Sequence, residues 1–230
     1  MRTIFVRQPA YLPALVMFDQ MLHADTYVIY DDVQYERRHY GNRNRLRTHQ
    51  GAIWITVPVL QKGKRDQLYN QTKIDNSQNW REAHWKSIYL NYCKSPYFNK
   101  YSDYFEELYS KSWETLLDLN MEIIVYLKGV LDINTELILS SQIKVNPYKD
   151  KSSRLANIVN ALNGDIYLTS KNASGYLDEK VFNKLGIDVS WYGFTHPKYN
   201  QIHGEFIPYM STIDLLFNYG DKSKDIIRSK

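Results

Sequence analysis

An imidazole and a carboxylate lie two residues apart in the segment QIHGEFIPY, residues 201–209. Side chains at i and i+2 of an extended chain point the same way, so His203 and Glu205 are expected to face one site. The pair suits a general base that is oriented by an acid. Two alternatives stay open, a metal site with His196 as third ligand and a loop histidine that binds the backbone. We prefer the base over the metal because no HExxH or comparable spacing is present.

Two adjacent carboxylates, Asp31 and Asp32, follow an apolar segment at residues 26–30. A pair of this kind at the end of a strand can hold a divalent cation, orient sugar hydroxyls or act as a general base. The alternative is a turn whose aspartates accept bonds from backbone amides. The sequence leaves both interpretations open, and the neighbouring Tyr30 and Gln34 join them as candidate ligand-binding residues.

The basic segment, residues 35–49 (YERRHYGNRNRLRTH), holds five arginines against one acidic residue, although the whole chain has a net charge of only +4. Guanidinium groups bind phosphate or carboxylate through paired hydrogen bonds that an ammonium group does not make. The alternating run Asn42, Arg43, Asn44, Arg45 would bind a phosphate from a locally extended stretch. A solvated basic loop is the alternative. Arginine and asparagine together favour the anion site, and the nearly balanced charge elsewhere disfavours nucleic acid as the partner.

His84 lies one helical turn after Trp80 and is a further candidate for ligand binding. A histidine packed against a tryptophan is commonly a half-buried structural residue, and this alternative stays open. Cys93 is the only cysteine, which excludes an intramolecular disulfide and a cysteine-rich zinc site. The chain also lacks the glycine-rich dinucleotide, P-loop and nucleophile-elbow motifs, so these standard sites lose support.

Strands and helices that would position these residues follow from the apolar periodicity and the turn residues. Strands are predicted at 3–8, 26–32, 52–59, 68–75, 135–140, 165–170 and 187–193. Helices are predicted at about 13–23, 80–92, 101–110, 112–131, 152–162, 176–186 and 208–220. The strands at 52–59 and 68–75 are expected to pair as a hairpin after an irregular basic loop.

Three details of these helices are specific enough to test. In the helix 80–92, a buried stripe is expected at helical spacing, formed by Trp85, Ile88, Tyr89 and Tyr92. Ser112 is expected to cap the helix at 112–131. Pro208 is expected to begin the last helix.

The alternation of strands and helices predicts an α/β fold, with a mixed or mostly parallel sheet flanked by helices and a helical middle section at about 77–131. A single domain is expected over residues 1–230. In such folds ligands bind at the carboxyl ends of strands. Most of the candidate residues follow a predicted strand, which favours a site over simple packing.

No segment approaches the roughly 18 apolar residues of a membrane-spanning helix. The first apolar run, Ile4 to Val6, is also too short for a secretory signal. We therefore expect a cytoplasmic protein without membrane insertion.

Several blocks of the chain resemble, in the same order, those of the WbqC-like proteins of bacteria. The resemblance runs from about residue 4 to residue 220. The blocks are QPAYLP, YDDVQY, NRNRLRT, WITVPV, HWKSIYLNY followed by SPYF, YLTS, and HGEFIPYMSTIDLLFN. One departure is TSKNAS, residues 169–174, where relatives are expected to have a loop that contains glycine and proline.

The resemblance implies a role in decorating a nucleotide-linked amino sugar. Members of this family are typically met in gene clusters for O-antigen and other surface polysaccharides, especially those with N-acylated 4-amino-4,6-dideoxy sugars. We therefore expect an N-acyltransferase or aminoacyltransferase that acts on such a sugar, with His203 as base and Glu205 as its orienting acid. The acyl donor stays open between acyl-CoA, formyl-folate, aminoacyl-tRNA and an aminoacyl carrier protein.

Other candidate residues take binding roles in this hypothesis. Arg43 and Arg45 would hold the diphosphate or an anionic donor, and Asp31 or Asp32 would position the sugar. The remaining contributions are a hydrogen bond from Gln8 and stacking on sugar or base by Tyr11, Tyr35 and Trp54.

Two alternatives from other classes stay open. One is a non-catalytic protein that binds sugar nucleotides or acts as a scaffold in polysaccharide assembly. The other is a nucleotidyltransferase-like enzyme, because a strand, the QPAYLP loop and a helix resemble the opening of HIGH-type nucleotide-binding folds. The His-x-x-His signature of those folds is absent here, which weakens the second alternative.

Overall fold

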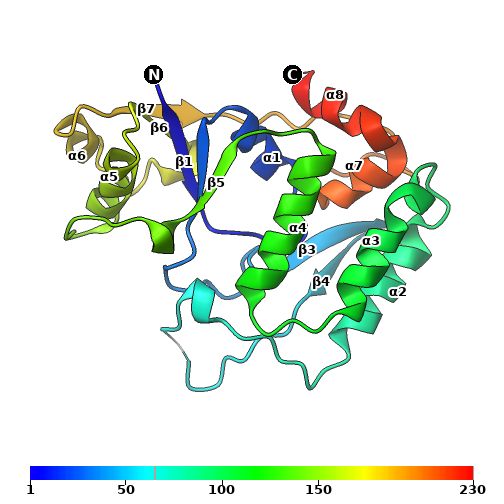
Figure 1. Ribbon diagram of the computed structural model, residues 1–230. Helices are drawn as coiled ribbons and strands as arrows, with labels where there is room; N and C mark the ends of the chain where they lie inside the picture. Colours follow the sequence, from blue (N-terminus) through cyan, green and yellow to red (C-terminus); the bar gives the residue numbers. More distant parts are fainter. Residues whose placement is uncertain (65, 230) are drawn as a thin grey trace. The chain divides into compact units, whose positions relative to one another are not determined.

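The computed structural model describes residues 1–64 and 66–229, which divide into two compact units (Figure 1). The sheet unit consists of Met1–Gln8, Phe18–Asp32 and Ile133–Thr195. The helical unit consists of Pro9–Met17, Val33–Asp132 and His196–Lys230. That the whole chain folds as one domain stays a prediction.

Five parallel strands form the sheet unit, in the order β5-β2-β1-β6-β7 (Figure 1). Their bounds are β1 Thr3–Arg7, β2 Thr26–Ile29, β5 Glu136–Leu139, β6 Ile166–Ser170 and β7 Asp188–Tyr192. The chain winds outward from β1 through β2 to β5 and then continues on the other side with β6 and β7. The winding direction therefore changes between β1 and β6. The predicted α/β fold with a parallel sheet is confirmed.

Side chains alternate between the two faces along a strand, and in the central strands β1 and β2 the side chains of both faces are buried. Ile4 and Val6 of β1 belong to an apolar core with residues of α5 (Lys151–Ala161) and α6 (Glu179–Asn183). Phe5, between them in the sequence, stacks on Tyr27 with ring centroids 5.4 Å apart. Strands buried on both faces read as continuous apolar runs, which is why the sequence predicts β1 and β2 within a few residues.

The helical unit contains one antiparallel hairpin and most of the helices (Figure 1). Its elements are β3 Arg43–Thr48, β4 Gly51–Thr56, α2 Trp80–Tyr92, α3 Phe98–Ser110, α4 Leu116–Val130, α7 Thr212–Tyr219 and α8 Ser223–Arg228. The remaining helix, α1 (Leu15–Leu22), begins in this unit and ends in the sheet unit. The predicted helical middle section is confirmed by α2, α3 and α4.

Aromatic rings pack these helices together. Phe217 of α7 lies 5.1 Å from Phe98 of α3, 5.3 Å from Tyr92 of α2 and 5.6 Å from Phe105 of α3, between ring centroids. Residues Thr212–Phe217 are all buried, so α7 is a core helix rather than an amphipathic surface helix. None of the helices described is both long and apolar enough to span a bilayer.

The predicted hairpin between 52–59 and 68–75 is wrong. The strand β4 pairs instead with β3, which lies inside the basic segment that was expected to be an irregular loop. The segment 68–75 forms a short 3-10 turn at Tyr69–Gln71 and meets residues 52–59 only through the isolated bridge Val59↔Ile74. The sequence does not reveal β3, because its period-two pattern is not one of apolar residues. Arginines occupy one side of the pattern, and an asparagine, Asn44, takes a fully buried position on the other.

Three details of the predicted helices also change. The buried face of α2 follows a spacing of four, with Trp80, His84, Ile88 and Tyr92, while Tyr89 is 50% exposed. The cap of α4 is Thr115, whose hydroxyl accepts from the Asp118 amide, and not Ser112. The last long helix is capped by Ser211, so Pro208 lies in the preceding loop. Short 3-10 turns also occur at Ser140–Gln142, Lys171–Ala173 and Gly220–Lys222.

Candidate functional site

An arginine-lined cavity of about 390 Å³ opens beside the hairpin of the helical unit. Its lining residues are Arg37, Arg38, Asn42, Arg43, Thr56 and Gln61, which we call the arginine cavity. The lining carries three guanidinium groups and no carboxylate. The arginine cavity therefore suits an anion, and the paired donors of arginine suit phosphate or carboxylate oxygens.

The hairpin places two of these residues opposite each other. Arg43, the first residue of β3, pairs with Thr56, the last residue of β4. The Arg43 guanidinium carbon lies 4.5 Å from the centre of the Trp54 ring, and the guanidinium also binds the Arg38 carbonyl. Arg37 and Gln61 both line the cavity, and Arg37 donates to the Gln61 carbonyl at 3.2 Å. The arginines are thus held in place by protein atoms before any ligand arrives.

A buried polar cluster supports the loop beneath the cavity. The Gly41 carbonyl accepts from the Tyr69 hydroxyl at 2.9 Å and from the Asn120 amide at 2.7 Å. The neighbouring Asn42 donates to the Val57 carbonyl at 2.7 Å. A Cβ atom at position 41 would lie 3.0 Å from Cε2 of Tyr69, so only glycine fits there without displacing that ring. This close packing fixes the loop that carries Arg37 and Arg38.

Tyr35 lies buried next to the same arginines. It is 4% exposed, and its hydroxyl has no hydrogen-bond partner among the described residues. Burial raises the pKa of Tyr35 to about 12, while the charges of Arg43 and Arg37 act in the opposite direction. The hydroxyl therefore stays protonated at neutral pH, close to two cations of the cavity lining.

Arg45 and Arg47 of β3 bind protein rather than open space. Arg45 donates to the carbonyls of Pro208 and Tyr209 at 3.0 and 3.1 Å. Arg47 donates to the Glu205 carbonyl at 2.9 Å. The two arginines thus hold the loop 201–209, here called the histidine loop, against the hairpin, and Arg45 does not line the cavity.

The histidine loop does not present its two candidate residues from an extended chain. Gly204, between His203 and Glu205, has a φ of +51°, which turns the backbone. His203 donates through Nε2 to the Asn91 carbonyl at 2.9 Å, which leaves Nδ1 as the acceptor of the ring. Glu205 is exposed. The alternation argument for this pair is therefore wrong, while its catalytic role stays a prediction.

A buried carboxylate anchors the far side of this loop. Asp214, in the first turn of α7, accepts from the Tyr199 hydroxyl at 2.9 Å and from the Gln201 amide at 2.8 Å. Gln201 in turn exchanges hydrogen bonds with the backbone of Ile207. Burial raises the pKa of Asp214, and its tyrosine and glutamine donors oppose that rise. The loop is a tightly bonded structure and not a loose linker.

Comparison with known proteins identifies the family to which the chain belongs. The profile of the WbqC-like protein family matches residues 8–226. The chain belongs to the WbqC-like protein family. It is also 35% identical over 230 residues to an uncharacterized protein of Mycobacterium tuberculosis (strain ATCC 25618 / H37Rv), covering 99% of this chain and 98% of the relative. No solved structure matches the chain significantly.

The aspartate pair of this WbqC-like protein lies in the sheet unit, beyond the end of β2. Asp31 is 1% exposed and accepts from the backbone amide of Ser141 at 2.9 Å and from the Ser141 hydroxyl at 2.7 Å. The Ser140 hydroxyl lies 3.0 Å from Asp31 and also contacts Asp32. Asp31 therefore caps the turn that follows β5, while a ligand-binding or catalytic role of the aspartate pair stays a prediction.

Asp32 is paired with a cation. Its carboxylate lies 2.6 Å from Nη2 of Arg154, whose guanidinium also donates to the Asp32 carbonyl. That guanidinium lies 4.9 Å from the ring centre of Tyr30 and 5.2 Å from that of Tyr148. Burial raises the pKa of Tyr30 to about 12, against the opposing charge of Arg154. The carboxylate of Asp32 is therefore engaged by the Arg154 guanidinium and is not free to act alone.

Tyr11 and His84 of the WbqC-like protein form a buried polar chain in the helical unit. Tyr11 Oη lies 2.8 Å from His84 Nδ1 and 2.5 Å from the Tyr109 hydroxyl. Desolvation lowers the pKa of His84 to about 4, although a bond to the Thr56 carbonyl opposes the shift. His84 is therefore neutral near pH 7, and its observed contacts are those of a structural residue.

Other predicted residues of this family member are not among those that line the cavity. Asn44 is fully buried and donates to the carbonyls of Tyr11 and Leu12. The remaining three are Gln8 after β1, Gln34 with a bond to Asp66 at 3.3 Å, and His196 with a bond to the Pro197 carbonyl at 2.8 Å. Among the predicted ligand-binding residues, Asn42 and Arg43 line the arginine cavity.

Four cavity residues of the WbqC-like protein were not selected from its sequence. Arg37 and Arg38 belong to the basic segment but lie outside the alternating run. Thr56 is brought to the cavity by the β3–β4 register, and Gln61 by the loop after β4. The density of arginines was the available signal for the first two, whereas the others require the pairing of the strands.

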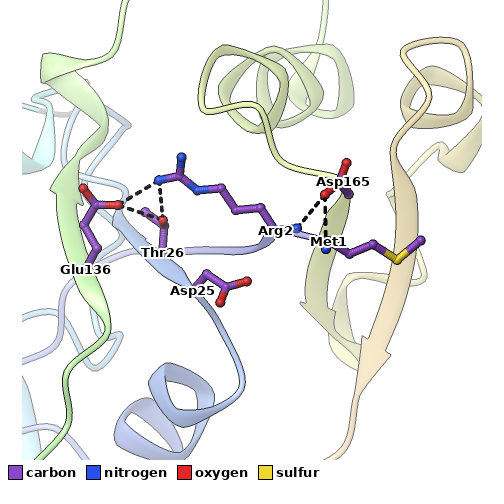
Figure 2. Close-up of a pocket in the computed structure, with 6 residues that line it drawn as sticks. All are labelled: Met1, Arg2, Asp25, Thr26, Glu136 and Asp165. Atoms are coloured by element: carbon purple, nitrogen blue, oxygen red, sulfur yellow. Dashed lines mark hydrogen bonds and ion pairs between the residues drawn. The ribbon is translucent and has the colours of Figure 1, made fainter.

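A second hollow, of about 560 Å³, lies at the amino ends of the sheet strands (Figure 2). Arg2 crosses it and donates to Thr26 at 2.9 Å and Glu136 at 2.8 Å. Its backbone amide donates to Asp165 at 2.5 Å. These bonds tie β1 to its neighbours, and ligands of open parallel sheets bind at the opposite, carboxyl ends. In residues 1–64 and 66–229, no group of three or more His, Cys, Asp or Glu suits a metal ion.

Proposed function

We propose that this WbqC-like protein is an N-acyltransferase or aminoacyltransferase that modifies a nucleotide-linked 4-amino-4,6-dideoxy sugar in the biosynthesis of O-antigen or another surface polysaccharide. The observation that carries the proposal is the arginine cavity, whose lining combines Arg37, Arg38 and Arg43 with neutral donors and no acid. A sugar nucleotide presents a diphosphate, which is the type of anion that clustered guanidinium groups bind. The identity of the sugar is inferred from the resemblance to family members that are met in gene clusters for surface polysaccharides.

His203 is the candidate base of the transfer. The amine nitrogen of the sugar would attack the acyl carbonyl of a thioester or ester donor, forming a C–N bond as the bond to the donor breaks. The base takes the proton that the nitrogen loses. Because Nε2 of His203 donates to the Asn91 carbonyl, Nδ1 is the acceptor that this role requires. Glu205 is exposed on the same loop, and its carboxylate would stabilise the positive charge that His203 acquires when it takes the proton.

The test is mass spectrometry of a nucleotide-linked 4-amino-4,6-dideoxy sugar incubated with the protein and each donor class in turn. An N-acylated product is expected with one donor. His203→Ala should reduce turnover by roughly 100-fold or more, the scale of a lost general base, while leaving the circular dichroism spectrum unchanged. Unchanged turnover in a folded variant would remove His203 from the mechanism.

Arg43→Ala should chiefly raise the KM for the sugar nucleotide, because the arginine binds substrate and transition state alike. Arg228→Ala is a matched control: this arginine of the helical unit donates to the carbonyls of Leu131 and Asp132 and does not line the cavity. An equal effect of both substitutions would contradict a specific anion site. Binding of the sugar nucleotide without turnover with any donor would support a non-catalytic binding protein instead.

The sheet order favours a second candidate, a nucleotidyltransferase-like enzyme. The winding direction changes between β1 and β6, and open parallel sheets bind nucleotides at the carboxyl ends of strands at such a point. The release of pyrophosphate from a panel of nucleoside triphosphates and sugar phosphates tests it. Pyrophosphate release that depends on the sugar phosphate would replace the acyltransferase proposal, and its absence would leave the first proposal in place.

A further inference from the structure

One face of the β3–β4 hairpin carries three successive cross-strand pairs. The pairs are Arg43↔Thr56, Arg45↔Trp54 and Arg47↔Ala52. Residues two apart on a strand share a face, and residues directly opposite each other on antiparallel strands do as well. The face is therefore about 13 Å long between Arg43 and Arg47, at roughly 3.3 Å per residue.

The two ends of this face belong to different parts of the proposed site. The first pair, Arg43 and Thr56, lines the arginine cavity. At the other end, Arg47 donates to the Glu205 carbonyl, and its Nη2 would lie 3.0 Å from a Cβ atom at position 204. Arg45, in the middle of the face, donates to the carbonyls of Pro208 and Tyr209. The histidine loop therefore lies against the middle of the face and against the end that is opposite to the cavity.

Trp54 occupies the middle of the face. Its side chain is a large aromatic ring on a strand, yet the residue is 46% exposed. The guanidinium carbons of Arg43 and Arg45 lie 4.5 and 5.8 Å from the ring centre, and the Tyr40 ring lies 5.6 Å away. These contacts fix the position of an indole that remains open to solvent over almost half of its surface.

Trp54 also differs from the other two aromatic residues that were candidates for stacking. Tyr11 is fully buried and Tyr35 is 4% exposed, so neither ring offers a surface to a ligand. Trp54 is the one of the three that is accessible and lies beside a cavity residue.

The geometry points to Trp54 as the stacking subsite for the sugar ring of the nucleotide-linked substrate. The inference rests on the proposed function: the diphosphate binds in the arginine cavity, the sugar ring stacks on Trp54 beside Arg43, and the 4-amine faces the part of the histidine loop that Arg45 holds. A deoxygenated hexose has an apolar face that packs on an indole, whereas the charged groups of the substrate lie to either side. The hairpin thereby sets the direction of the substrate, with phosphates at Arg43 and the amine toward the histidine loop at Arg45.

Calorimetric titration with two ligands tests this subsite. The ligands are a nucleoside diphosphate and the same nucleoside diphosphate linked to a 4-amino-4,6-dideoxyhexose. For the wild-type protein, the sugar-linked ligand is expected to bind more tightly. Trp54→Ala should weaken binding of the sugar-linked ligand about tenfold more than it weakens binding of the nucleoside diphosphate, which Trp54 affects only through its contact with Arg43. Trp54→Phe, which keeps an aromatic ring, should retain most of the difference.

Tyr148→Ala is the matched control, because Tyr148 is 48% exposed and also lies beside an arginine, Arg154. It should change neither affinity. Equal losses for both ligands in Trp54→Ala would assign Trp54 to the nucleotide and overturn the sugar subsite, as would no loss at all. Thermal unfolding of each variant shows whether it is folded.

Failure of the proposed function gives a different result. If Arg43→Ala binds the nucleoside diphosphate as tightly as the wild type, the diphosphate is not in the arginine cavity, whatever Trp54 does. A single-stranded RNA oligonucleotide gives a further outcome. If the RNA displaces the sugar-linked ligand from Trp54 and binds there more tightly than that ligand does, the face serves a nucleic-acid donor and the sugar subsite is wrong.

Discussion

Arginines that look equivalent in the sequence have different tasks along β3. Arg43 lines the cavity, whereas Arg45 and Arg47 donate to the carbonyls of the histidine loop. Guanidinium forks suit both tasks, since a backbone carbonyl and a phosphate oxygen are similar acceptors. Which acceptor each arginine meets depends on the loop that crosses the hairpin. Residue type therefore predicts an anion site, but the fold determines which arginines line it and which bind backbone carbonyls.

His84 has a measurable consequence for stability. Its pKa is about 4 in the folded protein and about 6.5 in an unfolded chain, so the unfolded state binds the proton first as the pH falls. The stabilising effect of neutral His84 is complete above pH 6.5 and is lost between 6.5 and about 4, roughly 3 kcal/mol in total. Urea unfolding at several pH values should show this loss, and His84→Gln should reduce it.

Glutamine keeps the hydrogen-bonding pattern of His84 without titrating, because its carbonyl accepts and its amide donates. The control is His49→Gln, since His49 is exposed on the surface of the same unit. This variant should lose stability in acid as the wild type does. An identical pH dependence for His84→Gln and the wild type would contradict the buried neutral histidine.

At the scale of elements, apolar runs predict the parallel strands and amphipathic segments predict the middle helices. The sequence shows β1 and β2 because both of their faces are buried, and it shows α2 to within a residue. It does not reveal β3, whose inward positions include the polar Asn44. That residue is buried because its amide binds the carbonyls of Tyr11 and Leu12, a tertiary contact that no local pattern contains.

The candidate site is predictable to the same extent. The density of arginine and asparagine indicates an anion site, and Asn42 and Arg43 do line the cavity. Gln61 and Thr56 join them only once β3 and β4 pair in the observed register. The expectation that His203 and Glu205 point the same way fails because glycine between them adopts a positive φ, which an extended-chain argument does not include.

The loop beneath the arginine cavity gives a prediction at this scale. Gly41→Ala would place a Cβ atom 3.0 Å from the Tyr69 ring and disturb the bonds from Tyr69 and Asn120 to the Gly41 carbonyl. We expect a loss of about 1–3 kcal/mol in the free energy of unfolding, as for other overpacked sites. Weaker binding of the nucleoside diphosphate should accompany it, because Arg37 and Arg38 lie on the displaced loop.

Gly129→Ala is the control for this substitution. Gly129 lies in α4, and among the described residues no atom other than those of its chain neighbours and the helix backbone lies within 4 Å of a Cβ placed there. Alanine in a helix is more favourable than glycine by roughly 0.5–1 kcal/mol, so this variant should be more stable than the wild type. Destabilisation of both variants, or of neither, would show that the packing around Gly41 is not the cause.

At the scale of the whole molecule, tyrosine is the residue that distinguishes this chain, with 20 among 230 residues. Many of these side chains fill the cores of both units, as Tyr27 does in the sheet unit and Tyr69 and Tyr92 do in the helical unit. Burial disfavours the phenolate, and it raises the pKa of these three side chains above the ordinary value of 10. The tyrosines therefore couple the stability of both cores to alkaline pH.

The chain should consequently unfold cooperatively within about one to two pH units above 10. A tyrosine with a raised pKa contributes stability that is complete below pH 10 and is lost as the pH rises toward the folded-state value. Each such group lowers the free energy of unfolding by about 1.4 kcal/mol per pH unit, so roughly five of them remove about 7 kcal/mol, half or more of a typical stability.

Phenolate absorbance and circular dichroism should change together. Tyr27→Phe should move the midpoint to higher pH, while Tyr89→Phe, at a 50% exposed position, should not. Phenolate formation that precedes the loss of structure would show that the buried tyrosines titrate in the folded state.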